Sequence, residues 1–307
     1  MKRKNEPIDI YRQGISLAVK KRPNKNKIML ILIIIFSLIL ISLITVQVTK
    51  ILKEAKIVTE YQNQLISLKE QEEQKAKKIE EKKEAKRVKY TDKWKQSVEH
   101  IYSSDKKRAF LTFDDGPSDV TPIILDTLKQ ENIKATFFVL GQRVEQKPDM
   151  VKRMYDEGHF IANHGYSHVY DSIYSSKEAV LDEFNKCNIA VQNAIGDNEY
   201  NSHLFRFPGG SIGGKYSELK LQAKDLLKQN GIESVDWNAL NGDAETNDLT
   251  PEFELERLQC TVQGKNSVVI LMHDSPLKKV TAESLSQLIG YLRNEGYEFN
   301  NFYDLET

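Results

Sequence analysis

The pattern of hydrophobic and polar positions divides the chain into three segments. The first contains residues 28–46, nineteen positions without a charge that are dominated by Ile and Leu. At about 1.5 Å per residue, a helix of this length just spans a bilayer core of roughly 30 Å. We therefore expect a transmembrane helix over residues 28–47. A cleaved signal peptide is the alternative, but the apolar run is longer than is typical and no small-residue cleavage site follows it.

The next segment, residues 48–105, is predicted to be a charged helical stalk and linker. From Lys50 to about Lys89 the chain is rich in Glu, Lys and Gln, with almost no Gly or Pro. Apolar residues with heptad spacing occur only at its start, at Ile51, Val58, Tyr61, Leu65 and Leu68. We interpret the segment as a stiff, solvated spacer, with weak self-association through these positions as the alternative.

From residue 106 onward, short apolar runs alternate with amphipathic stretches. Strands are predicted at residues 109–113, 135–139, 160–162, 204–207, 234–237, 268–271 and 297–299. Helices are predicted at residues 121–130, 148–156, 177–193, 218–229, 251–258 and 282–293. Strands that alternate with helices indicate βαβ units and a parallel sheet. We expect residues 106–307 to form an α/β domain, a distorted (β/α) barrel with about seven βα units.

Charge is distributed unevenly, although the 44 basic and 44 acidic residues cancel over the whole chain. The first 27 residues are strongly basic, so the remainder is mildly acidic. By the positive-inside rule, residues 1–27 form a cytoplasmic tail of a single-pass protein of the cell membrane, and the domain is extracellular. A mildly acidic domain argues against nucleic acid as a partner. The two cysteines, Cys187 and Cys260, exclude a dense disulfide framework and leave open whether they pair.

In a parallel α/β barrel, functional groups gather where the strands end. The first strand ends in Asp114 and Asp115, and a metal can bind one carboxylate while the other remains a base. An ordinary turn with a capping aspartate is the alternative. The third strand leads to His164 and His168, whose spacing places both on one face of a helical turn. Together with Asp115, they would form a metal site with open positions for water and substrate.

Two further strand ends carry groups that suit acid–base catalysis. Arg206 lies beside a glycine turn, where it can orient Asp114 through a bidentate contact, and the N–H groups that follow can face an oxyanion. His273 is the only remaining histidine at such a position, which makes it the natural general acid. Asp243, in the loop after Trp237, is expected to partner His273 and raise its pKa.

The order of these motifs resembles that of the polysaccharide deacetylase family, the NodB-type carbohydrate esterases. The resemblance covers roughly residues 106–305. It rests on the elements Thr112-Phe113-Asp114-Asp115-Gly116, His164-Gly165-Tyr166-Ser167-His168, Arg206-Phe207-Pro208-Gly209-Gly210, Asp236-Trp237 and Leu271-Met272-His273. It implies a distorted barrel with fewer βα units than the eight-fold form.

The resemblance also implies a role for each group at the strand ends. Asp114 would be the catalytic base and Arg206 would hold it. Asp115, His164 and His168 would bind a divalent metal, which we expect to be zinc, with cobalt or another transition metal as alternatives.

The remaining roles concern the acetyl group and its leaving nitrogen. His273 would be the catalytic acid. The backbone N–H of Phe207 would contact the acetyl oxygen, and Leu271 and Trp237 would line the pocket for the methyl group.

The expected reaction is the metal-dependent hydrolysis of N-acetyl groups on amino sugars. A domain outside a single membrane can reach the adjacent wall, so peptidoglycan is the expected substrate. An exported poly-N-acetylglucosamine or chitin-like polymer is the alternative substrate. An anchored, non-catalytic sugar-binding or scaffold protein is the alternative from another class, although a pure binder has no use for the complete set of base, ligands and acid.

Overall fold

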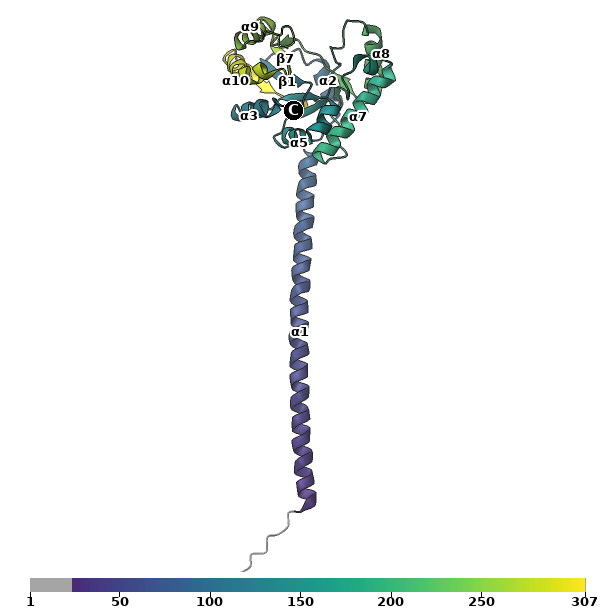
Figure 1. Cartoon of the computed structure of the whole chain (residues 1–307), viewed down its shortest axis with the longest axis vertical. Helices are drawn as coiled ribbons and strands as arrows, with labels where there is room; N and C mark the ends of the chain where they lie inside the picture. Colours follow the sequence, from purple (N-terminus) through teal and green to yellow (C-terminus); the bar gives the residue numbers. More distant parts are fainter. Residues whose placement is uncertain (1–23, 307) are drawn as a thin grey trace, which may run out of the picture. The chain divides into compact units, whose positions relative to one another are not determined.

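The computed structural model describes residues 24–306, and the chain divides into two compact units between Lys77 and Lys78. Most of the predicted cytoplasmic tail, residues 1–23, lies outside the described part. Helix α1 (Lys25–Glu84) runs without a break through the predicted transmembrane segment and most of the predicted stalk (Figure 1). By length and composition, it is the one helix among the described residues that can cross a membrane.

The second unit is built on a parallel sheet with the strand order β5-β4-β3-β2-β1-β7-β6, and β8 pairs with β1 off this path. The strands are β1 (Arg108–Asp114), β2 (Thr136–Val139), β3 (Phe160–Asn163), β4 (Leu204–Phe205), β5 (Glu233–Ser234), β6 (Ala239–Leu240), β7 (Ser267–His273) and β8 (Glu298–Asn300). In the described part of the chain, β5 and β6 end the order and do not pair with each other. The expected distorted barrel is confirmed in the form of a half-barrel of seven parallel strands.

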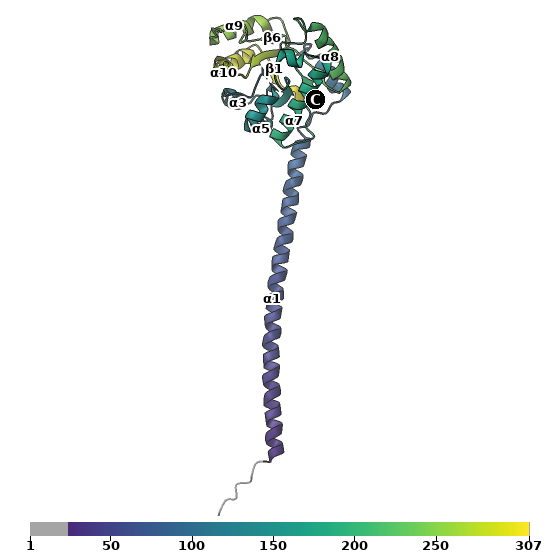
Figure 2. The same cartoon turned by 45° about the vertical axis from the view of Figure 1, so that its right-hand side comes forward.

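Helices form an arc around the outer side of this sheet, in the spatial order α9, α10, α3, α5, α7 and α8 (Figures 1 and 2). The helices of the unit are α2 (Asp92–Glu99), α3 (Thr121–Gln130), α4 (Gly141–Gln146), α5 (Pro148–Asp156), α6 (Tyr170–Ile173), α7 (Lys177–Ile195), α8 (Ser217–Gln229), α9 (Pro251–Val262), α10 (Lys279–Asn294) and the 3-10 helix η1 (Phe302–Glu306). All six predicted helices and seven predicted strands are present within a few residues of their expected bounds. The short elements β6, α2, α4, α6 and η1 were not predicted.

Local sequence explains where the longest helix of the unit, α7, begins and ends. The hydroxyl of Ser176 accepts the N–H of Ala179 at 3.0 Å and caps the first turn. Gly196 ends the helix in the left-handed conformation at φ 68°, which glycine adopts without steric cost. Cys187 is buried on this helix, Cys260 is exposed on α9, and both are free thiols.

Alternation along the strands decides which side chains face the interior of the half-barrel. In β1, Leu111 packs with the outer helices, whereas Phe110 belongs to the cluster on the opposite face. Asp114 is in phase with Phe110 and ends the inner row of that strand. In β7, Val269 lies in the same inner cluster, and His273 is in phase with it. The strand period therefore brings Asp114 and His273 to one face at the carboxyl ends of neighbouring strands.

The inner face of the sheet is filled at its other end by α2 and η1. Trp94 of α2 is fully buried, and its indole N–H donates to the carbonyl of Phe302 at 3.1 Å. The compact unit begins near Lys78, so α2 packs with the predicted catalytic domain, residues 106–307.

Candidate active site

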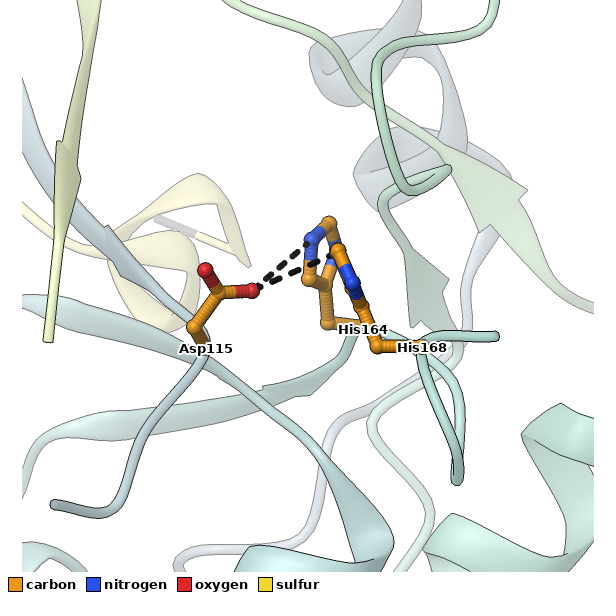
Figure 3. A group of neighbouring side chains, drawn as sticks. All are labelled: Asp115, His164 and His168. Atoms are coloured by element: carbon orange, nitrogen blue, oxygen red, sulfur yellow. Dashed lines mark ion pairs between the residues drawn. The ribbon is translucent and has the colours of Figure 1, made fainter. Parts of the chain in front are cut away.

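Asp115, His164 and His168 converge at the carboxyl ends of β1 and β3 (Figure 3). Oδ1 of Asp115 lies 3.6 Å from Nε2 of His164 and 3.5 Å from Nε2 of His168. Among the described residues, this buried oxygen has no hydrogen-bond donor. A buried carboxylate oxygen without a partner is costly unless a cation compensates it. The three side chains therefore fit a divalent metal.

His164 is held in the state that a metal ligand requires. Its Nδ1 lies 2.8 Å from the carbonyl oxygen of Arg206, to which it donates, so the lone pair of Nε2 points toward Asp115. Burial lowers the pKa of His164 to about 3, although the carboxylate of Asp115 acts in the opposite direction. The imidazole is therefore neutral, as a metal ligand must be.

The two histidines do not lie on a helical turn, so this part of the sequence prediction is wrong. Both lie in the irregular connection between β3 and α6, and His168 has a positive φ of 57°. Glu183 of α7 holds this loop by accepting the N–H groups of Tyr166 at 2.6 Å and Ser167 at 2.7 Å. It also accepts the hydroxyl of Ser167 at 2.8 Å. These hydrogen bonds, rather than helical spacing, bring His168 to the site.

A second buried carboxylate, Asp274, holds the turn that carries Asp115. It accepts the hydroxyl groups of Ser118 at 2.9 Å and Thr121 at 2.6 Å. A Cβ atom at Gly116 would lie 2.3 Å from Oδ2 of Asp274, so the turn requires glycine there.

Neither Glu183 nor Asp274 was singled out from the sequence. A signal was present for Glu183, which is a charged residue on the buried stripe of α7 between Val180 and Cys187. For Asp274, the signal was its place directly after the apolar strand β7.

Asp114 lies beside this cluster and is almost fully buried, with 2% of its surface exposed. Nη1 of Arg206 donates to its Oδ1 at 2.8 Å, and its Oδ2 lies 3.8 Å from Nε2 of His164. The expected bidentate contact is wrong, because the other guanidinium nitrogens of Arg206 donate to the carbonyls of Val235 at 3.3 Å and Asp236 at 3.0 Å. The arginine thus holds one carboxylate oxygen and leaves the other toward the site.

Burial raises the pKa of Asp114, while the positive charges of Arg206 and His273 oppose the rise. The carboxylate is therefore a stronger base than an exposed aspartate. The positive charge of the guanidinium is stabilised by a cation–π contact with the ring of Phe138, whose centroid lies 3.9 Å from Cζ of Arg206.

His273 ends β7 on the other side of Asp114, and the structure places it beside Asp243 as the sequence predicted. Nδ1 of His273 lies 2.8 Å from Oδ1 of Asp243, and its backbone N–H donates to Oδ2 at 2.7 Å. Burial lowers the pKa of His273, but the hydrogen bond and charge of Asp243 outweigh it and raise the pKa to about 9. The imidazole is protonated at neutral pH, so it can donate a proton.

Of the three residues predicted to contact the substrate, Leu271 and Trp237 lie near the other site residues with their side chains, whereas Phe207 can face a substrate only with its backbone. Leu271 continues the inner row of β7, and Trp237 lies with its ring centroid 5.8 Å from Cζ of Arg206. The side chain of Phe207 is fully buried against Phe205, so only its backbone can face a substrate. Among the described residues, no acceptor is bonded to the N–H of Phe207.

Two cavities lie near these groups. One of about 370 Å³ is lined by Trp237 but by none of the candidate ligands or acid–base groups. The other, of about 280 Å³, is lined by Asp115 and His168 and opens beside the ligand cluster. The site as a whole combines a buried carboxylate, a protonated imidazole and three converging side chains that could hold a metal ion, an arrangement that suits metal-assisted hydrolysis.

Comparison with known proteins identifies this arrangement. Residues 102–233 match the family described as "Polysaccharide deacetylase". A putative polysaccharide deacetylase of Bacillus subtilis, YheN, is 34% identical over 216 residues, which are 67% of this chain and 72% of that protein. The peptidoglycan-N-acetylglucosamine deacetylase PgdA of Listeria monocytogenes is 36% identical over 194 residues, or 63% of this chain. The chain spans only 37% of the length of PgdA.

Solved structures agree with the sequence comparison. The structure of a Streptococcus mutans CE4 esterase superposes with a TM-score of 0.61 at 32% identity, covering 67% of this chain and 90% of that one. The fold, the order of the motifs and the relatives agree, and the chain belongs to the polysaccharide deacetylase family, the NodB or CE4 carbohydrate esterases.

Proposed function

We propose that this protein is an anchored, metal-dependent deacetylase that hydrolyses the N-acetyl groups of N-acetylglucosamine residues in peptidoglycan. The observation that carries the proposal is the buried Oδ1 of Asp115, which lies between two imidazoles without a hydrogen-bond donor. The name of the PgdA relative supports the substrate, since that protein is a peptidoglycan-N-acetylglucosamine deacetylase.

Asp115, His164 and His168 would hold the metal. Two imidazole nitrogens and one carboxylate oxygen suit zinc, with cobalt or another transition metal as alternatives. A metal bound there would lower the pKa of a water molecule and polarise the acetyl carbonyl.

The side chains of this protein would carry the protons of the reaction. Asp114 takes the proton of the attacking water on Oδ2, the oxygen that Arg206 leaves free. His273 holds its Nδ1 proton against Asp243, so its Nε2 proton goes to the departing sugar nitrogen. The bond between the acetyl carbon and that nitrogen breaks, and the products are acetate and a free amine.

The backbone near Arg206 would stabilise the negative charge that develops on the acetyl oxygen. The N–H of Phe207 has no acceptor among the described residues and follows the arginine directly, so we assign it the oxyanion contact. Leu271 and Trp237 would line the pocket for the acetyl methyl group.

The proposed location follows from α1. Residues 28–47 would cross the cell membrane, residues 1–27 would remain in the cytoplasm, and the helix that follows would act as a spacer outside. Residues 48–77 extend about 45 Å as a helix. Such a spacer would allow the catalytic domain to reach the peptidoglycan next to the membrane.

The test measures acetate released by the full-length protein in detergent from peptidoglycan and from chitin oligomers. We expect release from peptidoglycan to stop after chelation, to return with zinc, and to be lost in Asp114→Asn. Preference for the chitin oligomers would favour the exported polymer as substrate. Tight binding of glycan without any acetate release would favour the scaffold alternative.

A further inference from the structure

Apart from Asp115 and His168, the residues that line the cleft of about 280 Å³ have no part in the reaction described above. Helix α4, which follows β2, forms one wall, and the loops that follow β1, β3 and β7 form the others. Its polar and aromatic lining includes Gln142, Arg143, Gln146, Tyr166 and Ser275. The cleft also borders Asp115 and His168, so whatever occupies it lies next to the bond that is hydrolysed.

Arg143 is the one lysine or arginine in this lining. Within residues 24–306 its guanidinium forms no direct hydrogen bond or ion pair, although its charge acts at longer range on Asp119 and Asp274. The neighbouring carboxylates are already engaged. Asp119 accepts a hydrogen bond from the ammonium of Lys147 at 2.6 Å, and Asp274 accepts one from the hydroxyl of Thr121 at 2.6 Å. Among the described residues, Asp115 is the one carboxylate that lines the cleft, and it faces the two histidines.

A half-buried guanidinium without a direct ion pair, such as that of Arg143, is suited to bind an anionic group of a substrate. Its planar fork matches a carboxylate, with which it forms two parallel hydrogen bonds. The side-chain amides of Gln142 and Gln146 offer donors and acceptors to sugar hydroxyls. The hydroxyl of Tyr166 donates a hydrogen bond to Glu145 at 2.9 Å, which holds the ring in place, and the ring offers an apolar wall. The cleft therefore suits a sugar unit that carries a carboxylate.

We propose that this cleft is a subsite for the unit next to the acetylated sugar and that Arg143 recognises a carboxylate on that unit. This inference rests on the proposed function and narrows its substrate to an acidic glycan. In peptidoglycan, such a carboxylate belongs either to the stem peptide or, where the peptide has been removed, to the lactyl group of muramic acid.

The experiment compares kcat/KM of the full-length protein in detergent for three substrates. These are peptidoglycan strands with their peptides, the same strands with the peptides removed by an amidase, and neutral chitin oligomers. The variants are Arg143→Gln and Arg143→Lys. Lys152→Gln is the matched control, because it removes a surface charge whose ion pair, among the described residues, is with Asp156 and which lies outside the cleft.

We expect Arg143→Gln to reduce the ratio of kcat/KM on acidic to neutral substrates about tenfold, mainly through KM. Arg143→Lys keeps the charge but loses the planar fork, so its ratio should lie between those of wild type and Arg143→Gln. Lys152→Gln should keep the wild-type ratio. High salt should narrow the gap between wild type and Arg143→Gln, because it screens the ion pair.

If the ratio of kcat/KM falls for just one of the two acidic substrates, the result supports the subsite and identifies the source of the carboxylate. If it falls for both, the result also supports the subsite. An unchanged ratio, or an equal loss on acidic and neutral substrates, would overturn it. If the wild type releases acetate from no substrate, the proposed function fails, but the cleft is still tested by the Kd for acidic strands. Weaker binding by Arg143→Gln than by Lys152→Gln then supports the subsite, and equal binding rejects it.

Discussion

Two pairs of imidazole and carboxylate lie at the same rim of this half-barrel, yet one imidazole is neutral and the other is protonated at neutral pH. In the ligand cluster, Nε2 of His164 is 3.6 Å from Asp115, and the pKa of His164 falls to about 3. In the second pair, Nδ1 of His273 is 2.8 Å from Asp243, and the pKa of His273 rises to about 9. Burial lowers the pKa of both histidines, so the hydrogen-bond partner of each imidazole decides whether its pKa ends below or above the ordinary value.

The comparison shows how one rim can hold a neutral imidazole and a protonated imidazole at the same pH. His164 donates its Nδ1 proton to a backbone carbonyl, which carries no full charge that would hold a second proton. His273 donates to a carboxylate that also accepts its backbone N–H, so the imidazolium is stabilised. Environments that push two pKa values apart are typical of acid–base sites.

Removal of the neutral imidazole should have the largest effect. We expect His164→Ala to weaken zinc binding by more than the roughly 100-fold that a change in an outer-shell partner costs, and to abolish acetate release. His100→Gln, at an exposed histidine, is the control. Zinc affinity by competition with a chelating dye checks the prediction, and wild-type affinity in His164→Ala would remove this residue from the metal site.

Removal of the carboxylate charge beside His273 should make its imidazole neutral, as that of His164 is. In Asp243→Asn the pKa of His273 should fall, because burial is then no longer outweighed. We expect kcat to fall by about 100-fold and the alkaline limb of the pH profile to move from near pH 9 to lower pH. An alkaline limb that stays in place in this variant would show that another group is the acid.

Loss of the loop carboxylate should have a smaller effect. Glu183→Gln keeps the shape of the side chain but weakens its hold on the N–H groups of Tyr166 and Ser167, so His168 is less well fixed. We expect zinc affinity to fall roughly 10-fold, the lower end of the effect of outer-shell partners. Glu178→Gln, exposed at the start of the same helix, should bind zinc as wild type does. Identical affinity in both variants would contradict the role of Glu183.

The smallest effect concerns the stability of the metal-free protein. The pKa of His273 is raised above the unfolded value of about 6.5, so its contribution is complete below that pH and is lost as pH rises toward 9. The pKa of His164 is lowered, so stability is lost as pH falls from about 6.5 toward 3.

Each histidine should change the unfolding free energy by about 1 kcal/mol per pH unit within its window. Urea unfolding of wild type and His273→Gln between pH 6.5 and 9 checks the first window. The gap between the two proteins should close as pH rises, and a gap that widens would contradict the assigned charge of His273.

The sequence predicted the parts of this site that lie at the ends of strands. Asp114 and His273 follow the apolar runs of two predicted strands, and the carboxyl ends of parallel strands meet at one rim. The structure adds that both are in phase with the inner residues of their strands. The loop of His164 and His168 could not be predicted in the same way, because its shape depends on Glu183, which lies on another helix. The buried stripe of α7 marks Glu183 as unusual, but the sequence does not show which loop its carboxylate contacts.

The same limit explains the other differences. Arg206 was expected to grip Asp114 with two nitrogens, but the carbonyls of Val235 and Asp236 accept its other donors, and backbone acceptors cannot be read from side-chain types. The burial of Trp94 could not be predicted either, because its indole N–H donates to the carbonyl of Phe302 at the far end of the sequence.

The central claim is that one divalent cation, held by Asp115 and two histidines, is required for deacetylation. The most direct test titrates zinc into the chelated full-length protein while acetate release from peptidoglycan is followed. The account predicts that activity rises linearly and stops at one zinc per chain, and that Asp115→Asn neither binds zinc tightly nor releases acetate. Full activity in the metal-free protein, or in Asp115→Asn, would contradict it.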